Sequence, residues 1–295
     1  MNIISSKIFI DGGEPEETRE ANQIFLKKLG RTLDGQTTNP TLIAKNLGIK
    51  KQEARIKNEK ITQEEAIEEY KRIVQEMSRT IPKGSVSIQV FANKETKAVE
   101  MLEQARTRNK WIPNASIKFP CTLEGLKAAS IACLEMDINI TLVFSQSQAA
   151  AVYEATVNAK YPIFISPFVG RLDDKGENGM EVVKNMLDMY NPPAGGGDGH
   201  VEVLTASVRN IEHIMYALYL KSDIITIPFK IFKLWADQNF PQPGGNYVYN
   251  PNELKTIAYR EEIVLGKDWM EYDLNHELTA KGVDNFYLDW MGLFS

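Results

Sequence analysis

Short β-rich runs alternate with stretches of helical periodicity along most of this 295-residue chain. We predict eight strands, at Lys7–Ile10, Gly35–Thr38, Ser85–Phe91, Ala115–Phe119, Asn139–Phe144, Ile163–Pro167, Val201–Ala206 and Ile224–Ile227. Eight strands separated by helices are typical of an α/β fold with a closed parallel sheet, the (β/α)8 or TIM barrel. A doubly wound open sheet is the second candidate, although the chain has no GxGxxG or P-loop sequence to support a nucleotide site.

The predicted barrel is followed by a segment of different composition. The run FPQPGGNYVYNP, residues 240–251, has the prolines and glycines of a boundary. We therefore predict a catalytic barrel over residues 1–239. Residues 240–295 are predicted to form a loop and a C-terminal helical extension that packs on the barrel through its aromatic side chains. The charged stretch Lys45–Lys60 and the glycine-rich stretch Asn191–Gly199 are interpreted as solvated connections without chemistry.

The composition argues against several classes of partner. A net charge of −5 without a basic stripe disfavours nucleic acid. No apolar run is long enough to cross a membrane, and the first residues lack the features of a signal peptide. The two cysteines, Cys121 and Cys133, do not make a disulfide framework and fit a reducing, cytoplasmic setting. The three histidines have no metal-ligand spacing, so we expect no metal site.

The most distinctive residue is a lysine inside a predicted buried strand. Lys118 stands between Ile117 and Phe119, just before a predicted helix. A buried ammonium is costly, and burial lowers a lysine's pKa, so that the free amine can attack a carbonyl carbon and form an imine. For this residue taken alone, a side chain that reaches water at a sheet edge is the simpler interpretation.

Other polar residues fall where the strands of a barrel would end, which is where TIM-barrel active sites lie. They are Asp11, Asn39, Gln89, Lys118, Thr141, Ser166, Ser207 and Arg209. Each has an ordinary explanation of its own, such as a turn at Asp11 or a helix cap at Asn39. Their combination predicts one pocket in which an acid/base group lies close to an amine.

The chemistry that such a pocket supports can be reasoned directly. An imine at Lys118 turns a ketose into an electron sink, so that the C3–C4 bond can break. Asp11 is the candidate base for the C4 hydroxyl proton. Thr141, a water molecule and Gln89 are candidates for moving protons while the imine forms.

The remaining candidates would bind substrate. The amides of Asn39 and Asn139 suit sugar hydroxyls. The guanidinium groups of Arg171 and Arg209, with the Ser207 hydroxyl, suit a terminal phosphate, because a guanidinium binds phosphate through two parallel hydrogen bonds.

These motifs are similar to those of the transaldolase family, over about residues 7–229. The resemblance rests on FID at 9–11, DGQTTNPTLIAK at 34–45, IKFPCTLEGLKAA at 117–129, NITLVFSQSQA at 139–149, ISPFVGRLDD at 165–174 and TASVRNIEHI at 205–214. A weaker similarity is HELTAKGVDNF at 276–286. TTNPTLIAK and SPFVGRLDD are specific strings, and the order and rough spacing of the segments also agree.

The resemblance implies a barrel of the class I aldolase type that needs neither a metal nor a cofactor. It implies Lys118 as the Schiff-base residue, Asp11 as the acid/base and Thr141 beside the catalytic water. It implies a substrate site made of Asn39, Ser166, Arg171, Ser207 and Arg209. The implied reaction transfers a dihydroxyacetone unit from sedoheptulose 7-phosphate to glyceraldehyde 3-phosphate in the non-oxidative pentose phosphate pathway, giving erythrose 4-phosphate and fructose 6-phosphate.

Two positions bear on which branch of the family this is. Many transaldolases have a glutamate where this chain has Gln89, and glutamine resembles the fructose-6-phosphate aldolase branch, which releases dihydroxyacetone. Phe168 favours transaldolase, because the aldolase branch tends to have a tyrosine there. The aldolase is therefore the second candidate, and a non-catalytic barrel that binds sugar phosphates is the third. Barrels of this kind often associate, so we expect that the chain can form a homo-oligomer.

Overall fold

The eight predicted strands form a closed parallel barrel in the computed structural model, which describes residues 4–54, 61–191 and 197–294. The strands are β1 Lys7–Asp11, β2 Gly35–Thr37, β3 Ser85–Gln89, β4 Ala115–Pro120, β5 Ile138–Val143, β6 Ile163–Pro167, β7 Val201–Thr205 and β8 Ile224–Pro228. Each strand pairs with the next in sequence, and β8 returns to pair with β1. The predicted TIM barrel is confirmed, and the open sheet is excluded.

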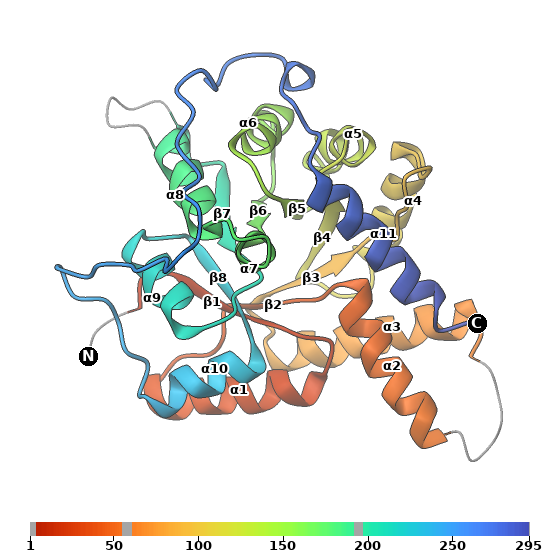
Figure 1. Cartoon of the computed structure of the whole chain (residues 1–295). Helices are drawn as coiled ribbons and strands as arrows, with labels where there is room; N and C mark the ends of the chain where they lie inside the picture. Colours follow the sequence, from red (N-terminus) through yellow and green to blue (C-terminus); the bar gives the residue numbers. More distant parts are fainter. Residues whose placement is uncertain (1–3, 55–60, 192–196, 295) are drawn as a thin grey trace.

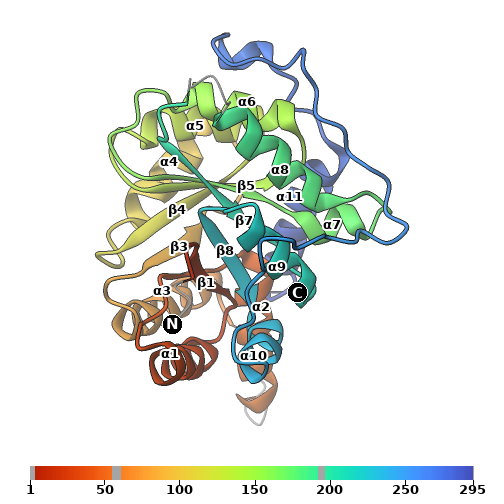
Figure 2. The same ribbon diagram turned by 90° about the vertical axis from the view of Figure 1, so that its left-hand side faces the viewer.

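Helices follow the strands and surround the barrel (Figures 1 and 2). They are α1 Pro15–Leu29, α2 Pro40–Ala54, α3 Gln63–Thr80, α4 Ala98–Arg108, α5 Leu123–Ala132, α6 Gln146–Ala155, α7 Val169–Asp173, α8 Gly179–Tyr190, α9 Ile211–Tyr219, α10 Phe229–Asp237, the 3-10 turn η2 Trp269–Glu271 and α11 Glu277–Met291. None of the helices within the described ranges has both the length and the apolar character that a membrane crossing requires.

Side chains alternate along each strand between the helices and the barrel interior. Apolar residues such as Ile8 and Ile10 are fully buried on the helix side. Inside the barrel, the ring of Phe9 packs edge-on against Phe164, with 6.1 Å between ring centroids. A side chain at Gly35 would overlap the Phe9 ring, because a β-carbon there would lie 2.5 Å from it. These aromatic rings fill one end of the barrel and leave polar residues at the carboxyl ends of the strands.

Two of the helices begin at a side-chain cap. At α3, Thr62 Oγ1 accepts from the Glu65 backbone N–H (3.2 Å), and Glu65 Oε2 accepts from the Thr62 N–H (2.8 Å), a complete capping box. At α6, the Ser145 hydroxyl accepts from the Gln148 N–H (3.2 Å). The Gln148 side chain does not return to Ser145. It donates instead to Thr279 of α11, at 2.8 Å.

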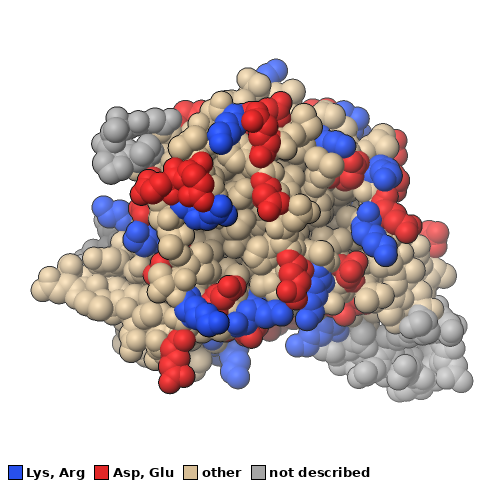
Figure 3. Space-filling view, turned by 45° about the horizontal axis from the view of Figure 1, so that its top comes forward, with Lys and Arg blue, Asp and Glu red and all other residues tan. Residues whose placement is uncertain are grey.

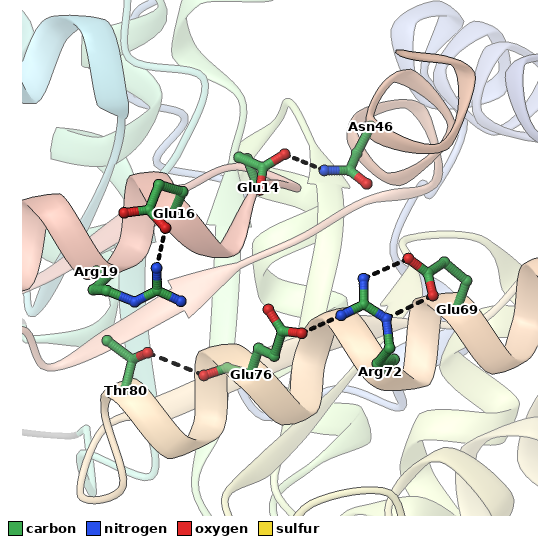
Figure 4. Close-up of polar contacts among 8 residues, drawn as sticks. All are labelled: Glu14, Glu16, Arg19, Asn46, Glu69, Arg72, Glu76 and Thr80. Carbon is green, nitrogen blue, oxygen red and sulfur yellow. Dashed lines mark hydrogen bonds and ion pairs between the residues drawn. The ribbon is translucent and has the colours of Figure 1, made fainter. Parts of the chain in front are cut away.

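The charged stretch Lys45–Lys60 differs from its prediction as a solvated connection. Residues 45–54 are the last two thirds of α2, and residues 55–60 lie outside the described parts of the chain. Asn46 ties this helix to the β1–α1 loop, since its side-chain amide donates to the carboxylate of Glu14 (Figure 4). Figure 4 also shows Arg72 of α3 between two carboxylates of its own helix, Glu69 and Glu76. Of the predicted loop Asn191–Gly199, residues 192–196 are likewise outside the described ranges.

After α10 the chain runs over the barrel surface and ends in α11, which packs against α2 and β5 (Figure 1). Aromatic rings hold this segment at both ends. Phe240 packs edge-on against Trp235, with ring centroids 4.8 Å apart. Near the C-terminus, Trp290 stacks on Phe91 at 4.1 Å and is 1% exposed. The predicted C-terminal helix is therefore present, and its aromatic side chains are its anchors.

Candidate active site

A cavity of about 230 Å³ opens at the carboxyl ends of the strands. Its walls are Asp11, Thr37, Asn39, Thr41, Leu42, Lys118, Ser166, Phe168, Arg171, Ala206, Ser207, Arg209, Thr226, Pro228 and Phe286. Eight of the eleven predicted site residues line it. The exceptions are Gln89, Thr141 and Asn139, of which Asn139 is hydrogen-bonded to Ser166 of the cavity wall and Gln89 lines a separate small cavity. Acidic and basic side chains are interspersed over the face of the molecule shown in Figure 3.

Lys118 lies inside the barrel, where a closed sheet offers no edge for its side chain to reach water. It is 3% exposed, and its Nζ donates to the Thr38 carbonyl at 2.9 Å. Burial lowers the pKa of Lys118 to about 8; the charge of Asp11 opposes that shift and Arg171 adds to it. About half of the amine is therefore neutral near pH 8 and able to act as a nucleophile, and the neutral fraction falls below that pH.

Asp11 is the last residue of β1, and its carboxylate shares the cavity with the lysine. Burial raises the pKa of Asp11, while Lys118 and then the hydrogen bond from Thr37 lower it. The Thr37 hydroxyl donates to Asp11 Oδ1 at 2.7 Å and lies 2.6 Å from the hydroxyl of Thr226. Because Thr37 has only one proton to donate, Thr226 must donate to Thr37. These hydrogen bonds fix the orientation of the Asp11 carboxyl group. Its burial favours the protonated form, and an acid/base catalyst has to be able to hold a proton.

Gln89 and Thr141 each present an unpaired polar atom. Both residues are buried, and neither Gln89 Oε1 nor Thr141 Oγ1 has a hydrogen-bond partner among the described residues. In the sheet, Gln89 pairs with Lys118 on one side of the lysine strand. Buried polar atoms without a protein partner are uncommon, which makes each of these two oxygens a candidate to hold a water molecule.

The three predicted hydroxyl-binding residues have different surroundings. Asn39 lines the cavity while its Oδ1 accepts from the Leu42 N–H at 3.0 Å, so it also caps α2. Asn139 is fully buried; its amide donates to Ser87 at 3.2 Å and accepts from Ser166 at 2.7 Å. Ser166 reaches the cavity wall, whereas Asn139 lies behind it and orients its hydroxyl.

The cationic end of the cavity comes from the chain after β6 and β7. Arg171 lies on α7, with its guanidinium carbon 5.1 Å from the centre of the Phe168 ring. Arg209 is bonded to Asp174 at 2.9 Å, and Ser207 has a left-handed backbone, with φ of 61°. Burial lowers the pKa of Arg171, and the charge of Arg209 lowers it further. Two like charges held together favour an anion between them.

His213 is a buried residue that contacts the cationic end of the cavity, and the sequence analysis did not identify this role. His213 is 2% exposed, and its Nδ1 accepts from the Arg209 backbone N–H at 3.3 Å. Its Nε2 lies 2.8 Å from Asp173 Oδ2, and with Nδ1 accepting, Nε2 is the donor. The histidine therefore holds the Arg209 backbone against the end of α7. The IEHI string contains it, but only the fold brings it to Asp173.

Comparison with known proteins agrees with this geometry. The family described as Transaldolase/Fructose-6-phosphate aldolase matches residues 8–295. A "Probable transaldolase" of Mesorhizobium japonicum is 32% identical over 286 residues, which cover 96% of either chain.

The chain belongs to the transaldolase/fructose-6-phosphate aldolase family.

Other relatives in the transaldolase/fructose-6-phosphate aldolase family match a smaller share of this chain. A "Probable transaldolase" of Thermoplasma volcanium is 37% identical over 229 residues, or 77% of this chain and 86% of that protein. One of Lactiplantibacillus plantarum is 35% identical over 235 residues, or 78% of this chain and 89% of that protein. The Mesorhizobium relative is therefore the more informative comparison for the C-terminal segment.

Proposed function

We propose that this protein is a transaldolase, which moves a dihydroxyacetone unit between sugar phosphates through a Schiff base on Lys118. The observation that carries the proposal is a buried amine, with a pKa lowered to about 8, in one cavity with a carboxyl group whose pKa is raised. A nucleophilic amine and a proton carrier of this kind are what cleavage and formation of a ketose C–C bond require.

In the proposed mechanism, Lys118 Nζ attacks the C2 carbonyl carbon of the ketose and forms a carbinolamine, which loses water to give the imine. Asp11 then takes the C4 hydroxyl proton as the C3–C4 bond breaks. The imine is protonated on its nitrogen, so that the bonding electrons pass to this iminium group, the aldose phosphate leaves, and a neutral enamine stays on the lysine. The enamine carbon attacks the aldehyde of the acceptor, and Asp11 returns its proton to the new alkoxide. Hydrolysis of the imine releases the product ketose.

The other residues of the cavity serve binding and proton transfer in this proposal. Thr141 and Gln89 hold the water that enters and leaves during imine formation, since both have an unpaired oxygen there. Asn39 and Ser166, the latter held by Asn139, bind the hydroxyls of the dihydroxyacetone unit.

The terminal phosphate binds at the cationic end of the cavity. Arg171, Arg209 and Ser207 line the same wall, and a phosphate dianion would offset the repulsion between the two guanidinium groups. The substrates are therefore expected to be phosphorylated sugars, as in the pentose phosphate pathway. We place the reaction in the cytoplasm, a reducing compartment in which the buried free thiols of Cys121 and Cys133 would persist.

A fructose-6-phosphate aldolase is the second candidate, and Gln89 is the residue that favours it. A glutamine can hold a water molecule but is a poor base. With Gln89, the rate of imine hydrolysis relative to the rate of transfer therefore differs from that of an enzyme with a glutamate at this position. Phe168, which cannot donate a proton, favours transfer.

A coupled assay with fructose 6-phosphate, with and without erythrose 4-phosphate, separates the two. We expect glyceraldehyde 3-phosphate and sedoheptulose 7-phosphate to form only when the acceptor is present, with little free dihydroxyacetone. Dihydroxyacetone as the main product without an acceptor would show the aldolase instead. Binding of the sugar without any product would leave the non-catalytic barrel. Gln89→Glu is the matched variant, and we expect it to increase the rate of transfer.

A further inference from the structure

The C-terminal helix reaches the candidate phosphate site at a glycine. A β-carbon added at Gly282 would lie 2.8 Å from Arg171 Nη1 and 2.6 Å from Leu142 Cδ2. Gly282 is inside α11, and glycine weakens a helix relative to alanine. Close approach of Arg171 and Leu142 therefore explains the glycine better than any need of the helix.

The same guanidinium contacts α11 one turn later. The guanidinium carbon of Arg171 lies 5.2 Å from the centre of the Phe286 ring and 5.1 Å from that of Phe168. Cations are attracted to the faces of aromatic rings at this distance. Arg171 is thus held by two rings, and Gly282 limits how far its Nη1 can move.

A hydrogen-bonded contact fixes α11 at this position. The Thr279 hydroxyl donates to the Leu142 carbonyl at 2.9 Å and accepts from the Gln148 side-chain amide at 2.8 Å. Leu142 has a left-handed backbone, with φ of 62°, at the irregular part of β5. α11 therefore has a defined height above the barrel, which sets the space between Gly282 and Arg171.

An outer cavity of about 320 Å³ adjoins the candidate active site and lies between α7 and α11, which Figure 2 shows close together. Arg171 and Arg209 line both cavities, and Lys281 and Asn285 of α11 line the outer one. Arg171 lies between the two cavities, so a small movement of its side chain decides which cavity the guanidinium group faces.

We propose that Gly282 is a positioning residue: it leaves Arg171 the room to face the inner cavity, and so makes the C-terminal helix a determinant of affinity for a terminal phosphate. This inference rests on the proposed function, because that function makes Arg171 a phosphate ligand. The ligand class is a phosphate monoester at the end of an open-chain sugar. A methyl group at position 282 would meet the side chains of Arg171 and Leu142 and no backbone atom, so both side chains must shift while the backbone of the fold is expected to survive.

The test is Gly282→Ala, compared with Gly292→Ala, the same change at the exposed residue that caps the C-terminal end of α11. Calorimetric titration with inorganic phosphate measures the anion site without turnover. Steady-state rates are measured in parallel with fructose 6-phosphate and with unphosphorylated fructose as donors. We expect Gly282→Ala to weaken phosphate binding and to raise the KM for fructose 6-phosphate, each about tenfold, the scale of one charged hydrogen bond. The kcat/KM for fructose and all values for Gly292→Ala should not change.

The outcomes separate this inference from the function on which it rests. Equal phosphate affinity in wild type and Gly282→Ala, or no phosphate binding by wild type, would overturn the role of Gly282. An equal loss for both donors would also overturn it, since that would show a general disturbance of the cavity. Failure of the proposed function appears elsewhere, as a wild-type protein that transfers no dihydroxyacetone unit.

Discussion

The burial of Lys118 predicts that replacing it stabilises the protein while it abolishes the reaction. The folded protein lowers the pKa of this lysine from 10.5 to about 8, a difference of about 2.5 units. Each pKa unit corresponds to roughly 1.4 kcal/mol, so the charged lysine costs the folded state about 3 kcal/mol. Lys118 is 3% exposed, so solvent screening does not reduce this figure much. Methionine has a similar length and no charge. Lys118→Met should therefore raise the free energy of unfolding by up to about 3 kcal/mol.

The dependence on pH has a definite sign. Below about pH 8 the lysine is charged in both the folded and the unfolded states, and the full cost is present. Between about pH 8 and 10.5 the folded state loses its proton first, so the cost shrinks and then disappears. The stability advantage of Lys118→Met should therefore be greatest at pH 7 and small near pH 10. Loss of the cation beside Asp11 reduces the gain, but burial already favours a protonated Asp11.

Urea denaturation of wild type and Lys118→Met at pH 7 and pH 10 measures these differences. Lys94→Met, at an exposed position, is the matched control and should change the free energy of unfolding by less than about 0.5 kcal/mol at either pH. A Lys118→Met protein that is less stable than wild type at pH 7, or whose advantage does not depend on pH, would refute the reasoning.

Substitutions at three further positions test individual contacts. Thr37→Val removes the hydroxyl that donates to Asp11 and should lower kcat about tenfold, since a hydrogen bond to a charged group contributes roughly 1.5–3 kcal/mol; Thr37→Ser should keep the rate. Thr279→Val leaves the Leu142 carbonyl without its donor and should cost about 1–2 kcal/mol in urea denaturation, with a smaller loss for Thr279→Ser. His213→Leu removes the acceptor of the Arg209 N–H, so steady-state kinetics should show a higher KM for fructose 6-phosphate with a smaller change in kcat.

The barrel could be predicted because each strand is a short run rich in β-branched residues next to a helical pattern. Lys118 and Asp11 could be predicted as partners because strand ends meet at one face of a barrel. The part of α2 from Lys45 onward was missed because its many charged residues resemble a solvated loop, although Leu47 continues the helical spacing of Leu42 and Ile43.

The parts of the site that the sequence did not predict depend on contacts between segments that are far apart along the chain. The relay from Thr226 through Thr37 to Asp11 exists only once β8 closes the barrel against β1, and a strand threonine has no signature of that role. Phe286 and Gly282 lie more than 100 residues after Arg171 along the chain. Only the weak similarity of HELTAKGVDNF, residues 276–286, marked that helix as part of the family's pattern.

The central claim is that the Lys118 amine forms an imine with a ketose phosphate. Borohydride reduction in the presence of fructose 6-phosphate, followed by mass analysis of peptides, tests it most directly. The expected result is one stable adduct, on the peptide that contains Lys118, and none in Lys118→Met. An adduct on a different lysine, or an unmodified Lys118 peptide in a protein that still turns over the sugar, would contradict the account.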